Sequence, residues 1–246
     1  MLPLHVFIIS WEGKHENAIS IAKNVRAVTD NVSIVYSDPN PKLVLDVECD
    51  LIERQNGLFW GDKFKACLDA WNSDLMLIIH GDCECEDWGC LVQQCQLACS
   101  KIPWIGVWAP HIDWALLSID RTHIAPINGT SLSVVAQTDA IVFCLSRHVG
   151  ERLRMANYER NIYGWGIDTL AVAHAYATNK IAVVDNSISV KHPRSRGYPV
   201  DVAQAQSQEF LRQLTPSEFI QNKLLWSHVG MNDIINSRDA NILRGI

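Results

Sequence analysis

The chain has 246 residues, and its composition of 48% hydrophobic and 20% charged residues supports a sizeable core and excludes an intrinsically disordered protein. A net charge of −6 without a long basic run argues against nucleic acid as a partner. No stretch has the roughly 18 apolar residues of a transmembrane helix, so we expect no span, with peripheral membrane contact left open. The first ten residues, MLPLHVFIIS, lack the features of a signal peptide and predict a first strand in a cytoplasmic protein.

Strand and helix patterns alternate through the first part of the chain. Apolar runs of strand length lie at residues 5–10, 32–38, 75–79 and 104–108. Apolar residues at helical spacing lie between them, at 16–28, 59–72 and 88–100. This β-α-β order predicts an α/β fold, with a mixed, mostly parallel sheet that helices flank on both faces. Ligands of such sheets bind beyond the carboxyl ends of the strands.

The second part is less regular. Residues 109–131 show few periodic signals, which predicts a long loop that acts as a flap or contacts an acceptor. Strands are predicted at 132–136, 140–145 and 181–190, and helices at 147–156 and 168–178. Amphipathic helices follow from residue 200, one of them beginning at the capping box TPSE. We therefore expect one domain over residues 1–198 and a C-terminal helical extension over 199–246.

Eight cysteines occur, and five of them fall between residues 83 and 99. In a reducing compartment free thiols are expected. The spacing of the five matches no known zinc-ligand pattern. Cys95 and Cys99 are four residues apart and would share one helix face, as buried thiols do. A zinc-stabilised structural domain built on this segment is kept as an alternative.

Histidine and acidic residues follow the apolar run LMLII directly, in the sequence HGDCE. In an extended chain His80, Asp82 and Glu84 would point to the same side. One or two carboxylates together with phosphate oxygens are typical ligands of Mg²⁺ or Mn²⁺. The pattern therefore indicates a cation site at a strand end, and a solvated turn is the alternative.

The stretch YGWGID offers a second group of functional candidates. Gly164 and Gly166 would let a ligand approach the backbone closely, and Trp165 would give a sugar ring a flat apolar face. Asp168 follows at the predicted start of a helix, where the helix dipole stabilises a carboxylate. It could serve there in catalysis or simply as the N-cap. His192, in VKHP, ends an apolar strand in the same region of the predicted sheet.

Taken in order, these motifs resemble those of glycosyltransferases with the GT-A fold, near family 2 and the galactosyltransferase-like branch. VFIISWEGKHENAISIAKNV is similar to the first strand, nucleotide loop and helix of that group, and IVYSD to the second strand. LMLIIHGDCE stands in the place of the D-x-D motif. YGWGID resembles the W-G-x-[ED] acceptor motif, and NSISVKHP the segment with the late metal-binding histidine. The resemblance covers about residues 1–193.

The resemblance implies roles for individual residues. Asp168 would be the catalytic base. The nucleotide-sugar donor would contact Ser10, Trp11, Glu12, Asp38, Lys63, His80, Gly81 and Asp82. The acceptor would contact Trp114, Gly164, Trp165 and Gly166. The metal ion, Mn²⁺ or Mg²⁺, would be bound by Asp82, Glu84 and His192. Residues 1–108 would form the nucleotide-sugar half of the domain and 109–198 the acceptor half.

The activity so implied is a metal-dependent transfer of a sugar from a nucleotide-sugar donor, most commonly a UDP-hexose, to a glycan or lipid-linked saccharide. With Asp168 as base the transfer would proceed by single displacement with inversion. Two alternatives stay open beside the zinc-stabilised domain. One is a retaining enzyme of the same fold. The other is an inactive domain that binds a nucleotide or glycan, which the histidine at position 80 in place of an acid would suit.

Overall fold

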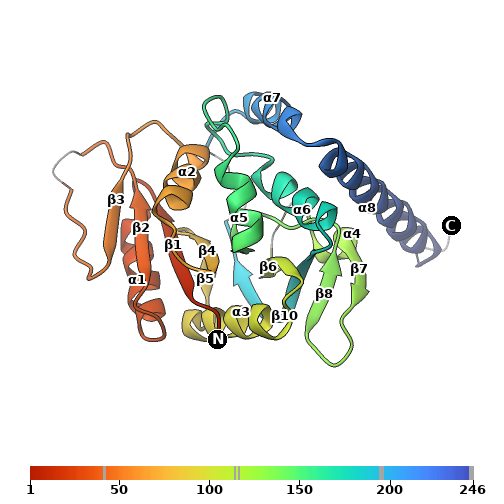
Figure 1. The fold of residues 1–246 in the computed structure, drawn as a ribbon, viewed down its shortest axis with the longest axis horizontal. Helices are drawn as coiled ribbons and strands as arrows, with labels where there is room; N and C mark the ends of the chain where they lie inside the picture. The colour runs from red at the N-terminus through yellow and green to blue at the C-terminus, as the bar shows by residue number, and fades with distance from the viewer. Residues whose placement is uncertain (41–42, 114, 116, 194–196, 244–246) are drawn as a thin grey trace.

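The computed structural model describes residues 1–40, 43–113, 115, 117–193 and 197–243 (Figure 1). Ten strands form one sheet, in the order β3-β2-β1-β4-β9-β6-β10-β8-β7, with β5 paired to β10. They are β1 Leu4–Ser10, β2 Val32–Tyr36, β3 Asp50–Glu53, β4 Leu75–His80, β5 Glu84–Cys85, β6 Ile105–Ile112, β7 His123–Pro126, β8 Leu132–Val135, β9 Val142–Ser146 and β10 Ile181–Lys191. The strands β1 to β4, β6 and β10 run in one direction, as the mostly parallel sheet predicted from the sequence requires.

Helices cover both faces of this sheet (Figure 1). One face packs against α1 (His15–Arg26) and α3 (Trp88–Lys101), and the other against α2 (Trp60–Ala70), α5 (Arg147–Arg154) and α6 (Ile167–Ala177). All seven residues of β1 are buried, as are the first five of β4, because helices lie over both sides of these central strands. Their carboxyl ends therefore meet at one edge, and that edge holds the candidate site.

The expectation of one long loop over residues 109–131 is wrong. Strand β6 continues to Ile112, and the segment also contains the short helix α4 (Ile119–Thr122) and strand β7. Its middle part is fixed to the C-terminal helix, because Arg121 forms an ion pair of 2.7 Å with Asp233. Tertiary contacts thus order residues that carry no apolar periodicity of their own.

Two helices follow the sheet at the C-terminus, as predicted. They are α7 (Val200–Phe210), which a short 3₁₀ turn (Leu211–Gln213) extends, and α8 (Pro216–Leu243). The capping box predicted at TPSE is present, since the Thr215 amide donates to Glu218 and the Glu218 amide to the Thr215 hydroxyl. Of the helices in the described part of the chain, none combines the length and apolar content needed to cross a bilayer. The expected division of the chain at residues 108 and 198 stays a prediction.

A buried ion pair fixes the start of α8 to the body of the protein. Glu218 has 1% of its surface exposed and accepts from Arg152 of α5 at 2.7 and 3.0 Å. His174 of α6 lies 2.8 Å from the same carboxylate. Burial alone would raise the pKa of Glu218, but hydrogen bonds from His174, Arg152 and the Thr215 amide lower it to about 2. The carboxylate is therefore charged in the folded protein.

Replacing Glu218 with glutamine is expected to lower the free energy of unfolding by roughly 3 kcal/mol, because Arg152 would stay buried without its counter-charge. The folded pKa lies below the unfolded value of about 4.3, so this stabilisation is complete above that value and is lost as the pH falls toward 2. Urea unfolding at pH 7 and pH 3 measures both effects. Glu209→Gln is the control: it breaks an exposed pair with Arg212 and should cost at most about 1 kcal/mol. Equal losses in the two variants at pH 7 would contradict the anchoring role.

Candidate active site

Three side chains that could hold a metal ion gather at the carboxyl ends of β4 and β10. One ligand atom from each of His80, Asp82 and His192 lies within 4.8 Å of those of the other two. His192 Nε2 is 3.7 Å from Asp82 Oδ2. Two imidazoles and one carboxylate are a donor set suited to a transition metal such as Mn²⁺.

Two buried polar atoms in this group lack hydrogen-bond partners within the described part of the chain, and a bound cation would take that place. His80 Nε2 and Asp82 Oδ1 are buried, and neither has a hydrogen-bond partner among the described residues. Burial, with smaller contributions from His192 and Lys63, lowers the pKa of His80 to about 3, which keeps the ring in the neutral form that binds metals. Burial raises the pKa of Asp82, and His192 opposes that rise. The residues present therefore fit a divalent cation.

Glu84 lies apart from this group. Residues 81–83 form a turn closed by a hydrogen bond from the Cys83 amide to the His80 carbonyl (3.1 Å), so the alternation of an extended chain is lost. Asn17 of α1 holds the turn by donating to the carbonyls of Gly81 and Cys83. Glu84 is exposed in β5 and lines a different hollow with Asn17. The sequence thus predicted one face for Asp82 and Glu84, and the structure places them on two.

The predicted nucleotide loop contains a relay of hydrogen bonds. Ser10 Oγ lies 2.7 Å from Nδ1 of His15, and Nε2 of the same ring lies 2.9 Å from Asp38 Oδ2. The Asn40 amide and His15 lower the pKa of Asp38, so its carboxylate stays charged. Ser10 is wholly buried, whereas Glu12 is exposed. Sequence reasoning missed His15, although its place in the first turn of α1, five residues after Ser10, is a usable signal.

Lys63 lies beneath the site rather than open to it. It is 3% exposed, and its ammonium group donates to the Leu58 carbonyl at 2.9 Å. Burial lowers its pKa to about 8, and its charge contributes to the lowered pKa of His80. Its influence on a nucleotide would therefore be electrostatic, exerted from below the strand ends.

The YGWG loop lies against the same edge through an aromatic side chain. Gly164 and Gly166 have φ angles of +71° and +88°, which only glycine adopts without strain. A side chain at Gly164 would also meet the Gly61 amide nitrogen at 2.9 Å. Trp60, beside Gly61, has its ring 4.8 Å from that of His80. Trp60 therefore stands between the metal-ligand candidates and the predicted acceptor loop.

Trp165 has a partner beyond the motifs used in the sequence analysis. Its indole N–H donates to the hydroxyl of Tyr198 at 2.9 Å. Tyr198 also stacks on Tyr163, with ring centroids 4.8 Å apart. The tyrosine comes from the segment that leads into α7, so it was not recognisable as part of this loop. It holds the indole plane in place at the edge of the site.

Asp168 is not the N-cap of α6, and the capping alternative is wrong: Gly166 occupies that position. The carboxylate lies in the first turn and accepts from the Thr169 amide at 2.8 Å. Burial, and secondly the charge of Asp139, raise the pKa of Asp168 to about 7. The helix dipole was expected to keep the group ionised, but burial outweighs it. A carboxyl group that titrates near neutral pH is suited to act as a general base.

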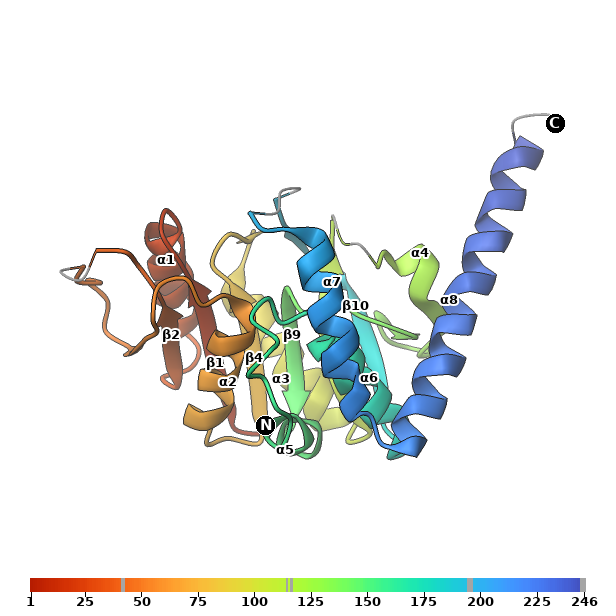
Figure 2. The same cartoon turned by 90° about the horizontal axis from the view of Figure 1, so that it is seen from above.

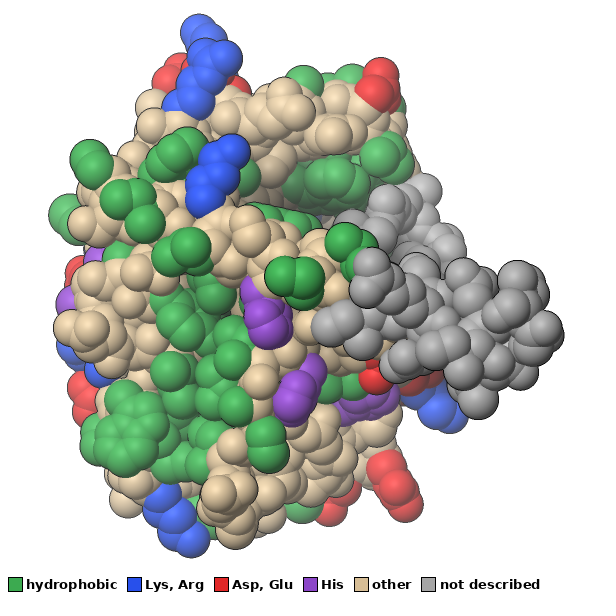
Figure 3. Space-filling view, turned by 90° about the vertical axis from the view of Figure 1, so that its right-hand side faces the viewer, with side chains coloured by type: hydrophobic (Ala, Val, Ile, Leu, Met, Phe, Trp, Pro, Cys, Tyr) green, Lys and Arg blue, Asp and Glu red, His purple; other side chains and the backbone are tan. Residues whose placement is uncertain are grey.

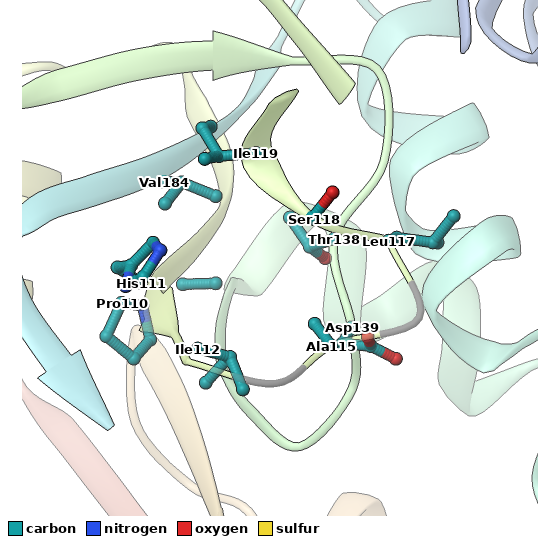
Figure 4. Close-up of a pocket in the computed structure, with 11 residues that line it drawn as sticks. Pro110, His111, Ile112, Ala115, Leu117, Ser118, Ile119, Thr138, Asp139 and Val184 are labelled. Atoms are coloured by element: carbon teal, nitrogen blue, oxygen red, sulfur yellow. The ribbon is translucent and has the colours of Figure 1, made fainter. Parts of the chain in front are cut away.

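Asp139, whose charge contributes to the raised pKa of Asp168, also lines a small hollow at the surface (Figure 4). The hollow lies between the end of β6 and the segment before β9, and His111, Ser118 and Thr138 are among its lining residues. Thr138 is buried, and its hydroxyl has no hydrogen-bond partner among the described residues. Buried polar groups without partners are suited to bind a hydroxyl-rich ligand. No motif marks these residues, so sequence reasoning missed them.

Two other expectations concern residues outside this group. Trp114, predicted to contact the acceptor, lies outside the described residues. The cysteines of 83–99 do not gather: Cys83 is buried, Cys85 half-buried and Cys90 exposed. Cys95 and Cys99 of α3 instead lie with Cys144 of β9 in the core, their sulfur atoms within 4.8 Å of one another. Cys95 and Cys99 are buried, as their helical spacing predicted.

No family model matches the chain, and no curated protein matches it either. Solved structures do. A mannosyltransferase from Pyrobaculum calidifontis, in complex with GDP-Man and Mn²⁺, has a TM-score of 0.55 at 11% identity over 100% of this chain and 80% of its own. GalNAc-T7 with UDP, GalNAc and Mn²⁺ has a TM-score of 0.59 at 11% identity, over 88% of this chain and 49% of its own. The chain has the GT-A fold.

A third match shows how far this fold reaches. The CMP:2-keto-3-deoxy-manno-octonic acid synthetase complexed with CTP has a TM-score of 0.50 at 12% identity, over 86% of this chain and 99% of its own. The GT-A fold predicted from the sequence is thus confirmed, while at these identities the likeness is one of architecture. The activity must be argued from the site.

Proposed function

We propose that this chain is a metal-dependent glycosyltransferase that moves a hexose from a nucleotide-sugar donor to a hydroxyl of a glycan or lipid-linked acceptor. The group of His80, Asp82 and His192 at the strand ends carries the proposal. Ligand atoms of His80 and Asp82 are buried without a hydrogen-bond partner among the described residues, and the group lies at the edge where α/β folds bind their ligands. The likeness to GT-A structures with Mn²⁺ and sugar nucleotides supports it.

In this proposal the three residues hold Mn²⁺ or Mg²⁺ together with the diphosphate of the donor. The bound cation would neutralise charge on the departing nucleoside diphosphate. Asp38, held by His15 and the Asn40 amide, would accept hydrogen bonds from the base or ribose. Lys63 would add positive potential from below. The histidine at position 80, which could have marked an inactive domain, becomes a ligand instead.

Asp168 is proposed as the base that accepts the proton of the attacking acceptor hydroxyl, with inversion at the anomeric carbon. The group lies beside Trp165, whose indole Tyr198 fixes and which would form a wall of the acceptor site. Thr138 and Asp139 would contact sugar hydroxyls from the hollow opposite. The product anomer, determined by NMR, distinguishes this inverting mechanism from a retaining one.

A screen of donors tests the proposal. We expect one nucleotide sugar, among GDP-mannose, UDP-GalNAc and UDP-glucose, to raise the Tm only with Mn²⁺. At 100 times its Kd the ligand should stabilise the protein by about 2.7 kcal/mol. For a chain of this length that corresponds to roughly 5–11 °C. The same donor should then be consumed when glycan acceptors are added. If CTP together with a sugar acid stabilises the protein and no nucleotide sugar does, the result would instead favour nucleotidyl transfer.

The pH dependence of the transfer should reveal Asp168. Since the base must be ionised and its pKa is raised to about 7, the rate at saturating donor should rise through neutral pH and level off above it. Asp139→Asn removes a nearby negative charge, so the pKa of Asp168 should fall and the rise should move to lower pH. Asp74→Asn, which changes an exposed carboxylate paired with Arg147, is the control and should leave the midpoint unchanged. If the pH midpoint of the rate does not move in Asp139→Asn, the charge of Asp139 does not influence the pKa of the catalytic base.

A further inference from the structure

Helix α8 exposes an apolar face along most of its length. The exposed fractions of its hydrophobic side chains are Phe219 50%, Ile220 57%, Leu224 59%, Trp226 39%, Met231 60% and Ile234 52%. The opposite side of the helix packs on the protein through Glu218, Leu225 and Val229. The helix is therefore held along one side and presents apolar side chains on the other.

Four of these exposed residues, together with Ser227, follow the spacing of a coiled-coil seam over two heptads. Ile220, Leu224, Ser227, Met231 and Ile234 are separated by four, three, four and three residues in turn. Such alternation places side chains along one line that faces a second helix lying alongside. Phe219 and Trp226, the other two exposed apolar side chains, lie to one side of this line. The pattern thus indicates a helical partner.

The face stands clear of the rest of the protein. Figure 2 shows α8 leading away from the body, with its C-terminal part projecting beyond the sheet. Figure 3, which shows the side of the molecule with α8, β7 and β8, has several groups of hydrophobic side chains at the surface. A helix of 28 residues is roughly 42 Å long, so its outer face can contact another helix over several turns.

We propose that α8 pairs with α8 of a second copy of this chain, so that the protein is a two-fold dimer. We call the residues 220, 224, 227, 231 and 234 the α8 seam. A two-fold axis brings the same seam of both copies together and closes the assembly, so no second complementary surface is needed. The pairing is independent of the proposed transferase activity.

The charges on this face favour a protein partner over a lipid surface. Among the described side chains, Lys223 is the charged residue next to the seam. Its ammonium group lies over the Phe219 ring, 5.5 Å from the ring centroid. Adsorption to anionic lipid generally requires several basic residues on the polar border of the helix. The chain as a whole carries a net charge of −6.

The middle of the α8 seam suits close approach of two helices. Ser227 is small, and Gly230 lies one turn further along the same side. The Ser227 hydroxyl donates to the Lys223 carbonyl at 2.8 Å, so it would enter the interface with its hydrogen bond already made. The four apolar side chains of the α8 seam are each more than half exposed in the monomer, so pairing would remove this apolar surface from water.

Sedimentation velocity of the full chain, from 1 to 100 µM, tests the pairing. We expect the 27.7 kDa chain to sediment as a dimer at the upper concentrations. The double variant Leu224→Glu, Met231→Glu should be monomeric throughout, with an unchanged circular dichroism spectrum, because both side chains are exposed in the monomer. Met155→Glu, at an apolar side chain 76% exposed elsewhere, is the matched control and should remain dimeric.

A cross-link identifies the partner. Ser227 is the midpoint of the seam, so two-fold pairing in either orientation places it beside its copy. In a Cys90→Ser background, Ser227→Cys should form a covalent dimer on mild oxidation, and the Glu double variant should abolish it. A wild-type chain that stays monomeric at 100 µM would overturn the proposal, as would a dimer that survives the double variant. Flotation of a monomeric wild type with phosphatidylglycerol vesicles would assign the face to lipid instead.

Discussion

Replacing Asp168 with asparagine is expected to lower transfer by about 10²–10⁴-fold, the usual loss when a general base is removed. Asparagine keeps the size of the side chain and can still accept the hydrogen bond from the Thr169 amide, so the fold should be unchanged. Donor affinity should stay near that of the wild type, because the residues proposed to bind the donor lie at the carboxyl ends of β1, β2 and β4. Steady-state transfer rates and a donor titration measure the two quantities separately.

The pattern of losses decides the role of Asp168. A large fall in rate with normal donor affinity supports the base. Because Gly166 caps α6, a loss of stability cannot be attributed to the cap, and urea unfolding should show little change. A variant with full transferase activity would remove Asp168 from the mechanism and leave the reaction without a named base.

Replacing Asp82 with alanine is expected to abolish Mn²⁺-dependent binding of the nucleoside diphosphate. Loss of a residue that merely supports a metal ligand usually costs 10–100-fold in affinity, and a ligand itself should cost at least roughly 100-fold. His192→Ala should weaken the same binding less, because a charged oxygen donor and the His80 imidazole remain. Calorimetric titration of the nucleotide with and without Mn²⁺ gives the affinities.

Glu84→Ala is the matched control, since it removes the other acid of the sequence HGDCE. The structure places Glu84 in β5, outside the group of His80, Asp82 and His192. Its variant should therefore keep Mn²⁺-dependent binding close to normal. Equal losses in the Asp82 and Glu84 variants would show that the turn at 81–83 opens when the cation binds. Unchanged binding in Asp82→Ala would end the metal-site proposal.

The sequence was informative where burial is complete. The apolar runs that became β1 and β4 were recognised because both faces of these strands are covered. Strands β3 and β7 were missed, since most of their residues are exposed and no apolar alternation marks them. The same limit applies to Arg121 and His123, whose partners on α8 are more than 100 positions away in the chain.

The candidate site shows a similar division. Asp82, Trp165 and Asp168 stand in recognisable motifs, and the structure brings their segments to one edge. The expectation that Asp82 and Glu84 share a face assumed an extended chain, whereas Asn17 from α1 stabilises a turn there. His15 carried a usable signal in its spacing from Ser10, but its partner Asp38 is 23 positions away. Asp139 acts on Asp168 only in the folded chain, so no local spacing could have revealed it.

The buried carboxylate of Glu218 has a consequence for how such a chain can be shortened or recombined. A chain that ended before this residue would leave both Arg152 and His174 without their carboxylate partner. Phe210, Leu225 and Val229 belong to the same core as α5 and α6, so that core would be opened as well. The last helices therefore cannot be exchanged as a module. Any natural variant that loses them would need compensating changes on α5 and α6, and the pair at positions 152 and 218 should be inherited or lost together.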